Sequence, residues 1–256
     1  MVSALQSCDV FFRDWLVMSG KNDSRSQLEF GIISECVPML SGSNNAFKVH
    51  IVDEEGQVVY GVYKPRRGEK PLWDFPDGSL YRRERAAYLL ALVARWEFIP
   101  LTVIRDGPYG IGSVQAMISF QSGQGYFGLD SSHANQLWPI AIFDLVVNNA
   151  DRKGGHCLLD EHGKVWSIDH GLTFHTDFKV RTVFWDFWGE NLPERMLREL
   201  TDLRGSLAAH RKEVQELASL IGREEFLAMQ ERIDAIIELG KHPMLDAYRN
   251  VPWPPY

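Results

Sequence analysis

Alternating apolar and polar residues mark the first half of the chain as rich in strands. Residues 47–52 alternate, and residues 30–39 and 58–63 are rich in apolar and β-branched side chains. Clusters of turn-forming residues at positions 41–45 and 53–56 separate these three segments. Three short strands joined by tight turns predict an antiparallel meander.

A helical period replaces this alternation at residues 81–95, where apolar side chains recur with the spacing of a helix face. Two more strands are expected at residues 101–105 and 113–119, separated by a turn that contains glycine and proline. Residues 123–132 are expected to form a loop. The first half therefore predicts one sheet accompanied by one helix.

The second half of the chain is mostly helical. Residues 134–148 form an apolar segment that predicts a buried helix, and short apolar runs at 157–159 and 165–168 predict a hairpin. Beyond the hairpin, amphipathic patterns predict three helices, at residues 193–203, 206–220 and 224–239.

Strands first and helices second predict an α+β protein with two lobes. We expect residues 1–118 to form an N-lobe with an antiparallel sheet and one helix, and residues 119–256 to form a mostly helical C-lobe. The chain has 256 residues, 45% of them hydrophobic and 24% charged, which is enough for two small lobes that share a cleft.

Charge and apolar runs exclude several classes of partner. A formal net charge of -7 disfavours a general affinity for nucleic acid. The longest apolar stretch, residues 138–147, is interrupted by a proline and by Asp144, so we expect no integral membrane association. The three cysteines, Cys8, Cys36 and Cys157, have neither disulfide nor zinc spacing, which favours a cytoplasmic protein.

Two aspartates frame the most informative part of the sequence. Asp151 follows the predicted buried helix in a polar, glycine-containing loop, and Asp169 follows the second strand of the predicted hairpin. Phosphoryl transfer needs one carboxylate to orient or deprotonate the nucleophile and another to hold the metal that bridges the phosphates. Asp151 fits the first role, Asp169 the second, and His156 fits a further metal ligand. Each motif alone is also typical of a solvated turn, but their order and separation favour the catalytic interpretation.

The first half supplies a lysine and a glutamate for the same chemistry. Lys64 ends the third predicted strand, and Glu84 lies near the start of the following helix. A lysine in an apolar strand is costly unless it is paired, so a carboxylate partner is expected. Glu69 and Glu97 are rival partners, and an unpaired lysine in solvent is the remaining alternative.

A loop of small residues joins the first two strands, where a phosphate-covering loop would lie. Ser41, Gly42, Ser43 and Asn44 would let backbone N–H groups approach an anion closely, although many hairpin loops have this composition. A basic cluster could contact the phosphates of a nucleotide or an acidic substrate, or could form a solvated helix face. Its members are Arg66, Arg67, Lys70, Arg82, Arg83 and Arg85.

Together, Lys64, Glu84, residues 151–156 and residues 168–172 resemble the phosphatidylinositol 3-/4-kinase and HipA-like branch of the kinase superfamily. Within that branch the chain resembles a bacterial family of uncharacterised proteins named for their similarity to phosphatidylinositol 3-/4-kinases. The resemblance covers about residues 28–190, and the best matching stretches are residues 63–69, 71–78 and 149–156.

The resemblance implies a two-lobed, minimal protein-kinase-like fold that binds ATP with Mg²⁺ or Mn²⁺. It implies that Lys64 contacts the phosphates with Glu84 as its ion-pair partner, that Asp151 is the catalytic base, and that Asp169 is a metal ligand. It also implies that residues 113–119 lead to the C-lobe as a hinge. The backbone near three hinge residues would then face adenine: Gln115, Met117 and Ile118.

His156 departs from the family pattern, which usually has asparagine at this position. A neutral imidazole suits softer divalent ions than Mg²⁺, so the metal preference is expected to shift towards Mn²⁺, or one metal site to be lost. A packed loop histidine that caps a carbonyl is the structural alternative.

These residues predict transfer of the γ-phosphoryl group of ATP to a hydroxyl group of a protein, a lipid or a small molecule. A pseudokinase that binds nucleotide without turnover is an alternative, and a protein AMP-transferase is another. The identity of the acceptor depends on the substrate site rather than on the fold.

Overall fold

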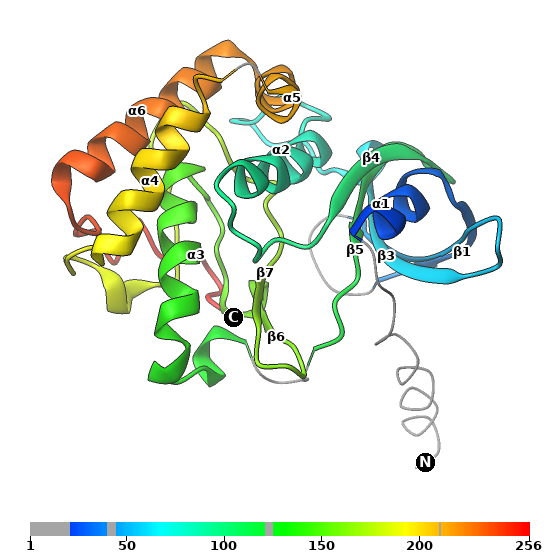
Figure 1. Cartoon of the computed structure of the whole chain (residues 1–256), viewed down its shortest axis with the longest axis horizontal. Helices are drawn as coiled ribbons and strands as arrows, with labels where there is room; N and C mark the ends of the chain where they lie inside the picture. The colour runs from blue at the N-terminus through cyan, green and yellow to red at the C-terminus, as the bar shows by residue number, and fades with distance from the viewer. Residues whose placement is uncertain (1–20, 40–44, 121–124, 210) are drawn as a thin grey trace.

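A five-stranded antiparallel sheet forms one end of the molecule, on the right of Figure 1. The computed structural model describes residues 21–39, 45–120, 125–209 and 211–256. The strand order β1-β2-β3-β5-β4 confirms the predicted meander and adds the two later strands beside β3. The strands are β1 (Ile32–Pro38), β2 (Phe47–Val52), β3 (Val58–Pro65), β4 (Thr102–Gly107) and β5 (Gly110–Ala116).

Side chains from one face of the sheet form a small hydrophobic core of their own. In β2 the alternation is visible directly, since Phe47, Val49 and Ile51 are buried while their neighbours are partly exposed. Helix α1 (Lys21–Phe30) covers part of this core with Leu28. The hydrophobic pattern does not predict α1, because a segment with so few apolar residues lacks the stripe that marks an amphipathic helix.

Helix α2 (Leu80–Val93) lies N-terminal to the expected lobe boundary but packs with the helical part of the molecule. Its buried residues, among them Ala86, Leu89 and Leu90, belong to the large core that also contains Phe143. The small core of the sheet contains no residue of α2. Apolar contacts with the C-terminal half set the position of α2. The boundary between the two lobes at residue 118 stays a prediction.

The C-terminal half consists of helices and one short hairpin, as the hydrophobic pattern predicts (Figure 1). None of the helices in the described part of the chain is both apolar and long enough to cross a membrane. The hairpin is formed by β6 (Cys157–Leu159) and β7 (Val165–Ser167). The helices are α3 (Ala134–Val146), α4 (Glu194–Ser206), α5 (Lys212–Ile221) and α6 (Arg223–Leu239).

The predicted boundary between the second- and third-last helices was placed too early. Ser206 ends α4 instead of opening α5, because the buried side chains of Leu200, Leu203 and Leu207 continue the apolar stripe of α4 past residue 203. The expected loop at residues 123–132 contains two single-turn 3-10 helices among its described residues, Tyr126–Gly128 and Ser131–His133.

Three arginines at the start of α2 connect it to α5 and α6. Arg85 is buried and forms a forked ion pair with Glu216 of α5, with 2.8 Å from Nε to Oε1 and 3.1 Å from Nη2 to Oε2. Arg83 is 2% exposed and its Nη2 lies 2.7 Å from Oε1 of Glu225 in α6. Arg82 donates to the Ser219 carbonyl. Arg83 and Arg85 are therefore neither phosphate ligands nor part of a solvated face, because both are buried and paired with carboxylates.

Replacing Arg83 with methionine is expected to lower the free energy of unfolding by about 3 kcal/mol, since the partly buried carboxylate of Glu225 loses its cation and the Thr173 carbonyl loses its donor. The matched control is Arg82→Met, which removes a single contact at a less buried position and should cost less than about 1 kcal/mol. Urea unfolding followed by circular dichroism measures both changes. Equal losses in the two variants would contradict the role of Arg83 as a buried link between α2 and α6.

Candidate active site

Lys64 and Glu84 form the ion pair that the sequence predicts. Lys64 lies near the end of β3, and its Nζ pairs with Oε1 of Glu84, which projects from the second turn of α2 and is 3% exposed. The same Nζ lies 3.0 Å from Oδ1 of Asp169. Burial alone would lower the pKa of Lys64, but the charges of Asp169 and Glu84 raise it above its ordinary value. The lysine is therefore held as a cation between two carboxylates.

Glu84 also joins α2 to the segment that follows β7. Its Oε2 accepts a hydrogen bond of 3.0 Å from the backbone N–H of His170, so its two oxygens bind two different parts of the chain. Asp169, the residue before His170, has a left-handed backbone with a φ of 62°, which non-glycine residues seldom adopt. These contacts fix the direction of the Asp169 side chain, and Lys64 lowers its pKa well below the usual range.

His156 approaches the other oxygen of Asp169. It ends the short 3-10 helix Gly154–His156, and its Nε2 lies 3.3 Å from Asp169 Oδ2. The backbone N–H of Lys153 donates to Nδ1 at 3.4 Å, which assigns the ring proton to Nε2 and makes His156 the donor to Asp169. Burial lowers the pKa of His156 to about 4, so the imidazole is neutral at physiological pH.

Asp151 lines the same pocket as Lys64, Glu84 and Asp169. A cavity of about 110 Å³ is lined by Lys64, Glu84, Asp151 and Asp169 together with apolar and backbone atoms of neighbouring segments. Burial raises the pKa of Asp151, and the nearby charge of Lys153, whose Nζ is 3.4 Å from Oδ2, opposes that rise. The two aspartates that the sequence singles out therefore face one cavity, as their proposed roles require.

Three buried polar residues hold Asp151 and the end of β7 in place. Arg152 forms a forked ion pair with Asp144 of α3, at 2.7 and 2.9 Å, and donates to the Ile168 carbonyl at 2.8 Å. Asn149 donates to Asp144 and accepts from the backbone N–H of Asp151 at 3.0 Å. The sequence analysis did not identify this network, although an aspartate inside an apolar helix signals that a cation must lie nearby.

Four of the nucleotide-binding residues that the sequence predicts belong to the loop between the first two strands. Ser41, Gly42, Ser43 and Asn44 lie outside the described residues.

The three expected hinge residues are not among the described residues that line the cavity around Lys64. Gln115 lies inside the sheet, is buried, and donates through its side-chain amide to Thr102 at 2.9 Å, so it faces β4. The N–H of Met117 is bonded to the Tyr60 carbonyl at 3.0 Å, and Ile118 follows it in the connection between the lobes. Their contact with adenine stays a prediction.

Asp169 and His156 form a pair of candidate metal ligands. In the described ranges, no group of three or more His, Cys, Asp or Glu side chains is arranged to hold a metal ion. Carboxylate oxygens suit Mg²⁺ and Mn²⁺, and neutral imidazole suits somewhat softer divalent ions. The donor set fits a divalent ion that also binds phosphate oxygens and water, once the ring proton of His156 has moved from Nε2 to Nδ1.

Comparison with known structures gives the class of the fold. The structure of hydra Fam20 with sugar has a TM-score of 0.52 at 13% sequence identity, and the match covers 87% of this chain and 89% of that chain. A Golgi casein kinase structure matches with a TM-score of 0.48 at 13% identity, over 85% of this chain and 74% of the other. With its antiparallel sheet and helical half, the protein has a kinase-like, two-lobed fold. Its membership of the phosphatidylinositol 3-/4-kinase and HipA-like branch stays a prediction.

The family is shown by sequence. Protein Rv2133c of Mycobacterium tuberculosis is 32% identical in an alignment of 277 positions that covers 94% of this chain and 98% of that protein. The chain belongs to the same family as Rv2133c. No protein-family model matches it.

The neutral, buried state of His156 predicts a loss of stability in acid. The unfolded chain takes up a proton near the ordinary pKa of 6.5, whereas the folded protein does so only near 4. The free energy of unfolding should therefore fall as the pH falls from 6.5 to 4, by up to about 1.4 kcal/mol per pH unit from this residue.

His156→Asn should make this pH dependence shallower, and His162→Asn, which changes an exposed histidine, should leave it as in the wild type. Urea unfolding at a series of pH values measures the slope for each protein. A slope in His156→Asn as steep as in the wild type would show that His156 is not held neutral by the fold.

Proposed function

We propose that the protein is a phosphotransferase that moves the γ-phosphoryl group of ATP to a hydroxyl group of an acceptor. The observation that supports this proposal is the convergence of Lys64, Glu84, Asp151 and Asp169 on one cavity, from four separate segments of the chain. A cation, a metal-binding carboxylate and a carboxylate of raised pKa are the three groups that phosphoryl transfer uses. The resemblance to phosphatidylinositol 3-/4-kinases belongs to this proposal.

In this proposal, Lys64 binds phosphate oxygens, and Glu84 keeps it charged and directed into the cavity. Asp169 and His156 would hold Mg²⁺ or Mn²⁺, which supplies neutralisation of the phosphate charge when bound. The binding of nucleotide and metal would draw Lys64 and Asp169 apart from their direct contact, because both side chains then have phosphate or metal as partners.

Asp151 would orient and deprotonate the acceptor. The acceptor oxygen forms a bond to the γ-phosphorus, the bond between that phosphorus and the β,γ-bridging oxygen breaks, and ADP leaves. The proton of the hydroxyl passes to a carboxylate oxygen of Asp151, whose pKa burial has raised towards that of a useful base. The positive charge of Lys153 opposes this rise, because it favours the ionised carboxylate.

The hydrogen bond from His156 to Asp169 favours a second candidate function, a nucleotide-responsive binding module without turnover. If His156 keeps its proton on Nε2, it occupies the oxygen of Asp169 that a metal would use. Such a protein would bind ATP but transfer no phosphoryl group. Nucleotide binding with no ADP formation would support this function over the first.

Asp151→Asn should abolish transfer and leave nucleotide affinity nearly unchanged, because it removes the base and keeps the size of the side chain. A loss of about 10²–10⁴ in rate is expected for a missing general base. Asp169→Asn should instead weaken the metal-dependent binding of ATP. ADP formation from ATP with water as acceptor gives the rate, and thermal shift with ATP plus Mg²⁺ or Mn²⁺ gives the affinity.

Asp202→Asn, on the exposed surface of α4, is the matched control and should behave as the wild type in both assays. Intact-mass analysis of the protein after incubation with ATP separates a phosphoryl adduct from the larger adenylyl adduct of an AMP-transferase. The assignment of roles is wrong if Asp151→Asn and Asp169→Asn both match the control in rate and in binding.

His156→Asn should shift the metal preference towards Mg²⁺, because an amide oxygen replaces an imidazole nitrogen. The ratio of ATP affinities in Mn²⁺ and in Mg²⁺ is expected to fall by about tenfold relative to the wild type, the size of effect common for changes around a metal. Titration of ATP in each metal, with ADP formation as a second readout, measures the ratio. An unchanged ratio would exclude His156 as a metal ligand.

A further inference from the structure

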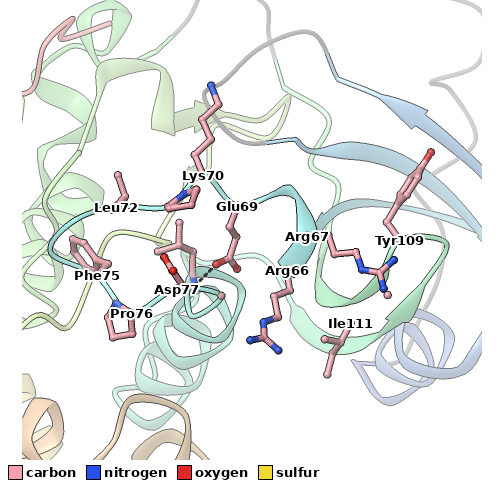
Figure 2. Close-up of a pocket in the computed structure, with 14 residues that line it drawn as sticks. Arg66, Arg67, Glu69, Lys70, Leu72, Phe75, Pro76, Asp77, Tyr109 and Ile111 are labelled. Carbon is pink, nitrogen blue, oxygen red and sulfur yellow. Dashed lines mark hydrogen bonds between the residues drawn. The ribbon is translucent and has the colours of Figure 1, made fainter.

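A second and larger cavity lies beside the cavity of the candidate active site, at the N-terminal end of α2. Its volume is about 570 Å³, and it lies between the turn of the β4–β5 hairpin and the loop that connects β3 to α2 (Figure 2). Glu69 and Leu80 line both cavities, whereas Lys64, Asp151 and Asp169 line only the smaller one. This cavity is thus a neighbour of the candidate active site and has a different lining.

Five charged residues among those described line the cavity, and two of them are the adjacent arginines Arg66 and Arg67. Arg66 and Arg67 are exposed on the 3-10 helix Arg66–Gly68, and within the described residues neither side chain forms an ion pair or a hydrogen bond. The side chain of Arg66 lies against Gly78, where an added Cβ would be 2.2 Å from its Nε. Two guanidinium groups without carboxylate partners are unexpected on a chain with a net charge of -7.

Glu69 forms no ion pair with either arginine, although the charge of Arg66 acts on its carboxylate from a distance. Glu69 accepts hydrogen bonds from the backbone N–H groups of Leu80 and Tyr81, at 3.1 and 2.8 Å, and so satisfies the first amides of α2 with its two oxygens. Asp77 is the other acidic residue of the lining, and in Figure 2 it lies on the side of Phe75, away from Arg67. Arg66 and Arg67 thus make one side of the cavity cationic, while the other side carries the carboxylate of Asp77.

Apolar side chains complete the cavity on both sides. Phe75 and Leu80 are buried, and they pack together with Ala150, the residue before Asp151. Tyr109 and Ile111, from the β4–β5 hairpin, line the cavity on the side of Arg67 and are 45% and 39% exposed (Figure 2). An aromatic or aliphatic group could therefore be covered on both sides while its charged end contacts the arginines.

We propose that this cavity binds a small organic anion, a phosphate or carboxylate group carried on an apolar body. The volume falls within the range of about 300–1,000 Å³ that is usual for small-molecule sites. The fork of an arginine matches the oxygens of phosphate and carboxylate alike, and a pair of them binds a doubly charged phosphate especially well. This site goes beyond the proposed phosphoryl transfer and does not depend on it.

Binding of two simple anions tests the proposal without nucleotide or metal. Phenyl phosphate and benzoate both join an oxyanion to an apolar ring, whereas inorganic phosphate and benzyl alcohol each carry one of the two features. Isothermal titration of the full chain with each compound gives the affinities. At least one of phenyl phosphate and benzoate should bind more tightly than inorganic phosphate and benzyl alcohol, and the tighter of the two identifies the oxyanion.

Arg66→Gln/Arg67→Gln should weaken binding of that compound by about tenfold or more, because charged hydrogen bonds are lost. The matched control is Arg223→Gln/Arg249→Gln, which removes two exposed arginines elsewhere and should leave the affinity within about twofold, less than one charged hydrogen bond contributes. The melting temperatures of the two double variants confirm that both are folded.

Three results would overturn the proposal. In the first, neither phenyl phosphate nor benzoate binds to the wild type. In the second, the wild type and both double variants bind the compound with equal affinity, and in the third, the two double variants lose affinity equally. The assay contains no ATP, so its outcome is independent of the transfer assays. Binding of phenyl phosphate without ADP formation would support this site and contradict the proposed phosphoryl transfer. ADP formation without binding of phenyl phosphate or benzoate would support the transfer and contradict this site.

Discussion

The arrangement of the candidate active site depends on the neutralisation of one partly buried cation, Lys64. Lys64 lies near the end of β3, and the residues on either side of it, Tyr63 and Pro65, are buried. The charge of Lys64 must therefore be balanced within the protein. Glu84 and Asp169 supply that balance from α2 and from the segment after β7. Three parts of the chain that are distant in sequence are thereby brought to one point. The second oxygen of Glu84 then fixes the backbone beside Asp169 and determines where that carboxylate can point.

The support for this arrangement comes mainly from arginines that never reach the cavity. Arg83 and Arg85 hold α2 against α5 and α6, and Arg152 joins α3 to the loop before the hairpin. In each case a guanidinium group satisfies a carboxylate and at least one carbonyl, which a lysine could not do with the same geometry. The positions of Glu84 and of the loop at Asp151 are therefore determined by polar contacts on the far side of the elements that carry them.

Much of the fold could be predicted from the sequence because its signals are local. The strand β2 and the hairpin strand β6 coincide with their predicted ranges. Lys64 pairs with a carboxylate, as expected for a charge at the end of an apolar strand. The helix α1 could not be predicted, because it has almost no apolar stripe. The start of α5 was predicted too early, since the apolar spacing of α4 runs on without a break.

The contacts around the cavity were harder to predict than the residues themselves. The need of Asp144 for a cation is visible in the sequence, but nothing there shows that Arg152 rather than another arginine provides it. His156 contacts Asp169 directly because a 3-10 turn places it there. The backbone N–H of Lys153 then sets the orientation of the imidazole ring. Such details follow from tertiary geometry, which residue spacing does not specify.

Among the described residues, the core of the sheet is separate from the large core of the helical half, and most buried residues of α2 belong to the latter. Lys64 is anchored in the sheet, whereas Glu84 and Asp169 are anchored with the other core. A rotation of the sheet over α2 would therefore stretch the contacts of Lys64 with Glu84 and Asp169, and it would also disturb the packing of α2 against β4 and β5. Because Glu84 is almost completely buried, added salt would screen its contact with Lys64 only weakly, so this link between the lobes should persist over a wide range of ionic strength.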